Sequence, residues 1–151
     1  MTACVILGMA LVHPASAGEL LVTMLDVGQG DGLLLETPGG ATVLVDAGLA
    51  RSRTAGQLQA LGVEHLDLVV ASHPHADHVG GMTEVLSAFP PDRFWFGGLH
   101  HTTQTWARVV GALETQGVEL EAVYQGERLV LDEVTLEVLW PQTPPLRDPR
   151  S

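Results

Sequence analysis

The sequence predicts a single α/β domain, and three observations support this prediction. Short apolar runs typical of strands alternate with segments of helical spacing along most of the chain. The apolar run at residues 66–71 has the length and β-branching of a buried strand, and a turn follows it directly. A chain of 151 residues is long enough for one hydrophobic core and leaves little room for a second.

Composition indicates a folded, acidic protein. Hydrophobic residues make up 46% of the chain, which argues against disorder. The formal net charge is −11, and every basic side chain is an arginine. An acidic surface repels phosphate backbones, so broad non-specific nucleic-acid binding is not expected. Bound divalent cations would offset that charge locally, which keeps a phosphodiester substrate compatible with this composition. The single cysteine, Cys4, cannot form an internal disulfide.

The N-terminal segment predicts a signal peptide. Residues 1–17 contain no charged side chain, and Ala15-Ser16-Ala17 fits the small-residue cleavage pattern that would make Gly18 the new N-terminus. The alternatives are a remnant of a membrane segment or a wrongly chosen start codon. The apolar run by itself is too short to span a bilayer. We therefore expect a secreted or periplasmic protein, or one associated with the membrane on its extracytoplasmic side if residues 1–17 are retained.

The first part of the domain predicts a strand and a glycine-rich turn. Residues 19–26 have strand character, and the glycines of residues 28–32 follow. The next residues, 33–36, have the pattern of a strand and not of a helix, which excludes a dinucleotide-binding turn. The glycines instead predict a tight turn near the functional site. Asp26 and Asp31 are candidates to orient ligands or substrate there, with turn capping as the alternative.

A hairpin and a helix are expected next. The turn at residues 37–40 and a return strand at 41–45 complete a hairpin with residues 33–36. Residues 51–61 predict a helix that ends at Gly62.

Beyond the central turn, helices alternate with strands. We expect helices at residues 82–89 and 105–115, and a buried aromatic strand at residues 94–96. His100 and His101 follow that strand on the expected active-site side. One of them could contact substrate or metal, and a structural role is the alternative.

The last expected elements are strands. They are residues 118–124, for which Gly117 is the expected start, residues 128–131 and residues 134–140. The domain is expected to span residues 18–141, with a Pro-rich tail at residues 142–151.

The chemistry of the chain is concentrated in one motif that follows the strand at residues 66–71. His73, His75, Asp77 and His78 lie within six consecutive positions. Imidazole and carboxylate ligands suit zinc, and also manganese or iron. His73 and His75 could share one ion, while Asp77 and His78 face a second. The alternative is a set of loop histidines that are exposed by chance.

The motif and its surroundings resemble the metallo-β-lactamase superfamily, and more closely its ComEC-type competence proteins. Four stretches carry the resemblance, namely residues 24–31, 43–48, 66–81 and 134–141. In ComEC-type proteins such a domain follows a membrane channel for DNA uptake. The resemblance implies a metallo-β-lactamase-like αββα sandwich, of which this chain represents mainly the N-terminal half.

The resemblance also implies roles for individual residues. His73, His75, Asp77 and His78 are the expected metal ligands, most simply for two Zn²⁺ ions, and Asp77 is the expected catalytic residue. Asp46 matches an aspartate that supports the metal-binding loop through hydrogen bonds. The implied activity is a metal-dependent hydrolase that acts on phosphodiesters, with DNA as the leading substrate, through a metal-bound hydroxide.

Two departures from the family pattern have consequences. Many members place a histidine after the strand equivalent to residues 134–139, where this chain has Trp140 and Pro141. The chain also has no Gly-Asp motif with a metal-bridging aspartate and no late histidine beyond Leu139; Asp148 lies in the tail and is a poor candidate. A half-sandwich would leave an apolar sheet face uncovered, which predicts a homodimer, a completing partner chain or poor solubility.

Two other functions remain open. The same scaffold could hydrolyse small esters, thioesters or lactams, because the fold does not choose between these chemistries. The domain could also be a non-catalytic metal-binding module, which the missing C-terminal ligands favour.

Overall fold

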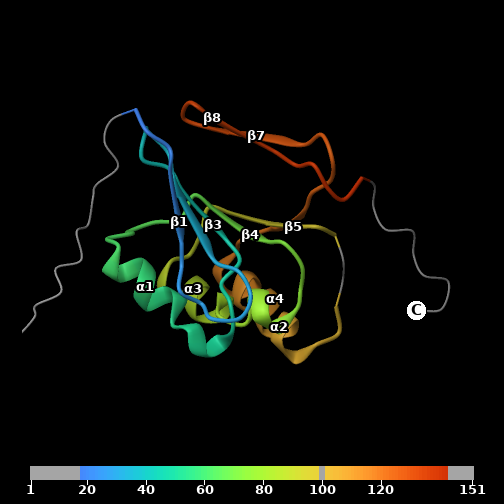
Figure 1. Cartoon of the computed structure of the whole chain (residues 1–151). Helices are drawn as coiled ribbons and strands as arrows, with labels where there is room; N and C mark the ends of the chain where they lie inside the picture. Colours follow the sequence, from blue (N-terminus) through green and yellow to red (C-terminus); the bar gives the residue numbers. More distant parts are fainter. Residues whose placement is uncertain (1–17, 99–100, 143–151) are drawn as a thin grey trace, which may run out of the picture.

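The computed structural model describes residues 18–98 and 101–142, which form a sheet with helices on one face and a β-hairpin on the other (Figure 1). The strands are β1 Leu21–Met24, β2 Leu33–Glu36, β3 Thr42–Val45, β4 Leu68–Ala71, β5 Arg93–Phe96, β6 Leu120–Ala122, β7 Arg128–Leu131 and β8 Val134–Glu137. The helices are the 3-10 turn η1 Ala50–Ser52, α1 Thr54–Ala60, α2 Ala76–Val79, α3 Met82–Ala88 and α4 Gln104–Gln116. The predictions for residues 1–17, for His100 and for the tail from residue 143 lie outside the described residues.

The sheet topology gathers several chain turns at one edge. Its strand order is β1-β2-β3-β4-β5-β6, in which β2 is antiparallel to both β1 and β3, and β3 to β6 are mutually parallel. Strand β1 therefore runs in the same direction as β3, β4 and β5. The carboxyl ends of these four strands meet at one edge, which is the usual position of a functional site in an α/β sheet.

The predicted hairpin is confirmed. Strands β2 and β3 pair with Leu33 opposite Val45 and Glu36 opposite Thr42.

Among the described residues, no helix is long and apolar enough to cross a membrane.

The predicted helix at residues 51–61 is divided in two. Arg53 has a left-handed φ of 53° and separates η1 from α1. Long-range hydrogen bonds hold this break: the Ser52 hydroxyl donates to the Val27 carbonyl at 2.8 Å, and the buried Thr54 hydroxyl donates to the Ala47 carbonyl at 2.7 Å. Local spacing does not reveal such contacts, so the continuous helix was a wrong prediction.

The prediction that Gly117 starts a strand is also wrong. Gly117 adopts a left-handed φ of 71° and caps α4, with its N–H bonded to the Glu114 carbonyl. This is the usual use of glycine after an amphipathic helix. The strand that follows, β6, is correspondingly shorter than residues 118–124.

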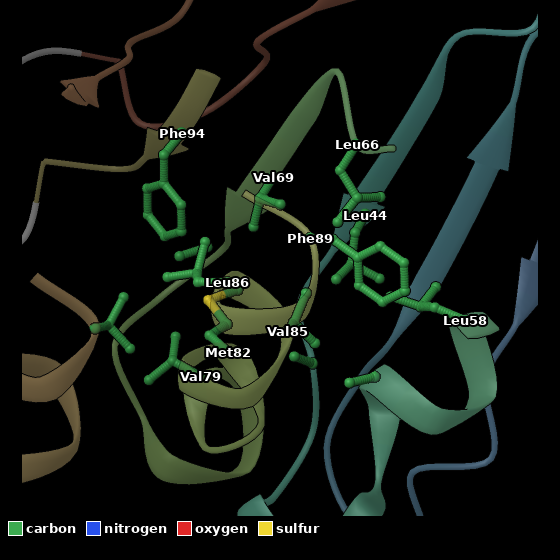
Figure 2. Packing of buried hydrophobic residues seen from close by; sticks show 14 of the residues in the cluster. Leu44, Leu58, Leu66, Val69, Val79, Met82, Val85, Leu86, Phe89 and Phe94 are labelled. Atoms are coloured by element: carbon green, nitrogen blue, oxygen red, sulfur yellow. The ribbon is translucent and has the colours of Figure 1, made fainter. Parts of the chain in front are cut away.

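The main core lies between the sheet and helices α1, α3 and α4 (Figure 2). Leu44, Val69 and Phe94 point from three neighbouring strands towards Val85 and Leu86 of α3, and all five are fully buried. The predicted core residues of α4 that are buried are Trp106, Val109 and Leu113.

A second, smaller core lies between the opposite sheet face and the β7–β8 hairpin. The sheet contributes Val43, Leu68 and Trp95, and Val123 joins them directly after β6. The hairpin contributes Leu129, Leu131 and Leu136, and Val138 joins them directly after β8. The hairpin turn is anchored because Asp132 accepts hydrogen bonds from the Thr37 hydroxyl at 2.5 Å and the Ala41 N–H at 3.2 Å. The face that was expected to be uncovered is therefore covered in part.

An ion pair joins β5 to β6 and makes stability depend on pH. Arg93 donates to both carboxylate oxygens of Glu121, at 2.9 and 2.7 Å, and Trp95 Nε1 donates to the same group at 3.2 Å. The Arg93 hydrogen bonds hold the pKa of Glu121 below its ordinary value of 4.5, with Trp95 adding to the effect and burial opposing it. Stabilisation by this pair is therefore complete above the unfolded-state pKa and is lost as pH falls through the lower folded-state pKa.

We expect Glu121→Gln to lower the free energy of unfolding at neutral pH by roughly 0.5–1.5 kcal/mol, because the pair is partly exposed. Urea unfolding at decreasing pH should show the difference from wild type shrinking as Glu121 becomes protonated. Glu133→Gln is the control, since this exposed carboxylate lies between β7 and β8 and has no ion-pair partner among the described residues. A difference that stays constant down to acidic pH would contradict this account.

Candidate metal centre

Backbone hydrogen bonds assemble three chain turns at the carboxyl edge of the sheet. The Asp46 N–H bonds to the Val70 carbonyl at 2.9 Å, which joins the end of β3 to β4. The Ala47 N–H bonds to the His78 carbonyl at 2.7 Å, and the Gly48 N–H bonds to the Asp31 carbonyl at 2.9 Å. The segment after β3 thus connects the helix of the histidine motif to the glycine-rich loop.

The structure brings all four predicted ligands together. The ring of His73 lies 3.9 Å from that of His78 and 4.7 Å from that of His75, between ring centroids. Asp77 Oδ2 lies 4.0 Å from His78 Nε2. His73 is therefore next to both other rings, and the division of the ligands into two pairs stays a prediction.

Asp46 is the buried polar group beneath this cluster. Its side chain is 2% exposed, and its backbone turns with a left-handed φ of 57°. The carboxylate accepts hydrogen bonds from the Ser72 N–H at 2.9 Å, the Ser72 hydroxyl at 2.5 Å and His78 Nδ1 at 2.8 Å. These contacts are of the kind that the resemblance implied for Asp46.

The same hydrogen bonds engage Nδ1 of His73 and of His78, which leaves Nε2 of each ring as the nitrogen that can bind a metal. A carboxylate only accepts, so His78 donates through Nδ1, and the lone pair of the neutral ring is then on Nε2. The Ser72 hydroxyl gives its one proton to Asp46, so it accepts from His73 Nδ1 at 3.0 Å. Asp46 thereby leaves the Nε2 lone pairs of both histidines available, directly for His78 and through Ser72 for His73.

The electrostatics favour the metal-binding forms of two groups. Burial, followed by the neighbouring His78 and His75, holds the pKa of His73 below its ordinary value of 6.5, so the ring is neutral at neutral pH. The pKa of Asp77 is also below its ordinary value. The main cause is a hydrogen bond from its own backbone N–H, to which Gln29 adds against the opposing effect of desolvation.

The glycine-rich loop packs directly against α2, as the predicted tight turn near the site requires. Gly30 has a φ of +93°, and a Cβ built on it would lie 1.6 Å from the Asp77 carbonyl oxygen. The Gln29 amide reaches Asp77 Oδ2 at 3.4 Å. Sequence reasoning assigned no role to Gln29 or Ser72. The only available signals were the position of Ser72 directly before His73 and that of Gln29 between two glycines.

The remaining predicted residues divide into two groups. Asp31 and His101 lie at the cluster, with Asp31 Oδ2 3.5 Å from His78 Nδ1 and the His101 ring 5.7 Å from that of His75. Asp26 is exposed, and its carboxylate contacts none of the described histidines.

The segment after β8 reaches the same edge of the sheet. A Cβ on Gly97 would lie 3.6 Å from both Pro141 and the Ser72 carbonyl oxygen, so the chain passes beside the site at this point. This is the segment in which the resemblance implies a histidine for many members, and here Trp140 precedes Pro141.

The types of donor at this site fit a divalent metal ion, although the group here whose ligand atoms all lie within 4.8 Å of one another is Asp31, Asp46 and His78. Three imidazoles, two with Nε2 lone pairs defined by hydrogen bonds, stand beside one ionised carboxylate. Nitrogen and oxygen ligands of this kind suit zinc and also manganese or iron.

The chain is similar to known proteins over most of its length. Residues 25–146 match the family model of the metallo-beta-lactamase superfamily. ComE operon protein 3 of Bacillus subtilis (strain 168) is 26% identical over 167 residues, covering 98% of this chain and 21% of that protein. Competence protein ComA of Neisseria gonorrhoeae is 32% identical over 125 residues, covering 76% of this chain and 17% of that protein. The chain thus spans about a fifth of the length of these curated relatives.

Solved structures share the fold. A metallo-beta-lactamase mutant from Cronobacter sakazakii matches with a TM-score of 0.58 and 24% identity, over 78% of this chain and 50% of that one. The metallo-beta-lactamase SMB-1 matches with a TM-score of 0.54 and 16% identity, over 77% of this chain and 48% of that one. With the family model matched over most of its length, the chain belongs to the metallo-beta-lactamase superfamily, a superfamily of metal-dependent hydrolases.

Proposed function

We propose that this domain is a metal-dependent phosphodiesterase, with DNA as its leading substrate. The observation that carries the proposal is the grouping of three imidazoles and the Asp77 carboxylate over the buried Asp46 at the carboxyl edge of the sheet. The similarity to ComE operon protein 3 and to competence protein ComA supports nucleic acid as the substrate, because the resemblance to ComEC-type proteins implies a domain that follows a channel for DNA uptake.

His73, His75, Asp77 and His78 would hold the metal, for which we propose two Zn²⁺ ions. Divalent ions bound there would supply an activated water and would neutralise negative charge that develops on substrate oxygens. Their charge would also offset locally a chain charge of −11 that otherwise repels a phosphate backbone.

The protein's own residues orient these groups. Asp46 and Ser72 hold the rings of His78 and His73 in one tautomer, which removes the need to reorient them during binding. Gln29 contacts the Asp77 carboxylate, which we propose as the catalytic group that positions the attacking water. His101 is exposed and its ring lies 5.7 Å from that of His75, so we propose that it contacts substrate.

The test compares metal-loaded wild type with His75→Ala and Asp77→Asn. We expect wild type to cleave a bis-aryl phosphodiester and single-stranded DNA, and both variants to lose at least about 100-fold in kcat/KM. His65→Ala is the matched control, because His65 lies at the opposite edge of the sheet, 51% exposed and 3.1 Å from Asp92. It should retain full activity.

The same experiment separates the alternatives. Turnover of aryl esters, thioesters or a chromogenic lactam without phosphodiester cleavage would replace the proposal with small-substrate hydrolysis. Metal binding without turnover of any of these substrates would favour a non-catalytic module. Phosphodiester cleavage that persists in both variants would show that the residue roles are wrong.

We also propose an extracytoplasmic location for the domain. The charge-free segment at residues 1–17, with its Ala15-Ser16-Ala17 cleavage pattern, supports this placement.

A further inference from the structure

The β7–β8 hairpin covers one face of the sheet (Figure 1), and a cavity of about 370 Å³ remains beneath it. Its walls include Val70 and Trp95 from the sheet and Leu136 from the hairpin. Glu137 is the one charged side chain among the described lining residues, and its carboxylate is paired with Arg128 on the neighbouring strand at 2.9 Å. Mostly apolar walls around a few hundred cubic ångströms are typical of a site for a small ligand.

The cavity reaches the metal centre. Ser72 and Gly97 line it at the carboxyl edge of the sheet. The Ser72 hydroxyl is hydrogen-bonded to the Asp46 carboxylate at 2.5 Å and to His73 Nδ1 at 3.0 Å. The same side chain therefore belongs to the wall of the cavity and to the support of the metal site. A group bound in the cavity would lie next to a substrate atom held by the metal.

Trp140 lies where the cavity opens to solvent, because its side chain lines the cavity and is 73% exposed. Backbone hydrogen bonds hold the segment on both sides of it. The Gln125 N–H donates to the Pro141 carbonyl at 2.7 Å, and the Gly126 N–H donates to the Val138 carbonyl at 2.9 Å. Trp140 therefore offers a large flat apolar surface from an anchored segment beside the metal centre.

The charge of the chain limits how a nucleic acid can be held there. Seven basic side chains stand against 18 acidic ones, so phosphate contacts away from bound metal contribute little affinity. Proteins that bind single strands also hold the bases, which stack on aromatic side chains. In a chain this acidic, contacts with the bases have to supply much of the affinity beyond the metal centre.

We propose that the cavity receives a nucleobase next to the scissile phosphate, and that this base stacks on Trp140. The inference rests on the proposed phosphodiesterase function and adds the part of the substrate that determines specificity. A base in a duplex is stacked between its neighbours and paired, so it cannot enter the cavity. The site therefore selects single-stranded DNA over duplex DNA.

Two phosphodiesters with the same leaving group test the proposal on the zinc-loaded 151-residue chain. They are thymidine 5′-(p-nitrophenyl phosphate) and its analogue without the base. We expect kcat/KM of wild type to be about 5–100-fold higher for the thymidine ester. Trp140→Ala should lower kcat/KM for the thymidine ester until this ratio is close to one, whereas Trp140→Phe should keep most of the preference. Val130→Ala is the matched control, since Val130 is 64% exposed on β7 and does not line the cavity.

Binding is measured separately, so that a failure of the proposed activity can be told from a failure of this inference. Fluorescence anisotropy should show at least about tenfold tighter binding of labelled oligothymidylate than of the same backbone with abasic sites. Trp140→Ala should lose this difference, and circular dichroism establishes that the variant is folded. If neither ester is cleaved while the base preference persists and depends on Trp140, the activity is wrong and the base site stands.

Three results would each overturn the inference. They are equal binding of the two oligonucleotides, a base preference that Trp140→Ala retains, and tighter binding of duplex than of single-stranded DNA. Cleavage of both esters by wild type with the same kcat/KM would overturn it as well, and would leave the proposed phosphodiesterase activity in place.

Discussion

Asp46→Asn is expected to weaken zinc binding by roughly 10–100-fold while leaving the four proposed ligands in place. The buried carboxylate accepts three hydrogen bonds, from the Ser72 N–H, the Ser72 hydroxyl and His78 Nδ1. An amide of the same shape has one accepting atom, and its NH₂ group would face donors. The tautomers of His78 and, through Ser72, of His73 would then no longer be set. Competition titration with a chromogenic chelator measures the change.

Two variants separate this effect from general destabilisation. Asp31→Asn removes an exposed carboxylate at 3.5 Å from His78 Nδ1 and should have a much smaller effect on zinc affinity. Ser72→Ala should weaken binding to an intermediate degree, because only the connection to His73 is lost, and Ser72→Thr should restore it. Unchanged zinc affinity in Asp46→Asn would refute the positioning role of Asp46.

Gly30→Ala is expected to lower the free energy of unfolding by about 2–4 kcal/mol, the combined cost of overpacking and backbone strain. The added Cβ would lie 1.6 Å from the Asp77 carbonyl oxygen, so the loop must move away from α2. That movement would also withdraw Gln29 from the Asp77 carboxylate. Urea unfolding measures the stability, and zinc titration the effect on the site.

Gly28→Ala is the matched control for this prediction. Gly28 has a similar φ of +72°, but a Cβ there would meet no atom within 4 Å. It should therefore show only the cost of a left-handed backbone, about 1–2 kcal/mol. The difference between the two variants isolates the contact with α2. Equal losses in both would mean that the loop does not pack on the helix as described.

Local patterns predicted most of the elements because burial imposes a period on the sequence. The apolar run at residues 66–71 contains β4, and the helical spacing of Trp106, Val109 and Leu113 marks the buried side of α4. The turn at residues 37–40 correctly predicted the β2–β3 hairpin. In each case a single stretch of chain contains both the apolar spacing of the element and the turn residues at which the element ends.

The wrong predictions concern places where distant residues decide the local conformation. Arg53 adopts a left-handed backbone between two side chains, Ser52 and Thr54, that bond to carbonyls of other segments. Gly117 was assigned to the following strand although it caps the preceding helix, since a glycine between two elements fits either. The packing of the β7–β8 hairpin on the second sheet face was likewise not foreseen. It depends on a tertiary contact, the hydrogen bond between Asp132 and Thr37.

The sequence by itself identified the superfamily, through four stretches of resemblance, and it predicted His73, His75, Asp77 and His78 as metal ligands. The spacing of these four residues after a buried strand carries that prediction, because a metal site needs particular donors at short separations. Only the tertiary structure decided how those donors are held. The buried Asp46 approaches His78 across 32 positions of the chain, and Gln29 approaches Asp77 across 48. Such contacts arise because parallel strands bring their carboxyl ends to one edge, and no local pattern encodes which side chains meet there.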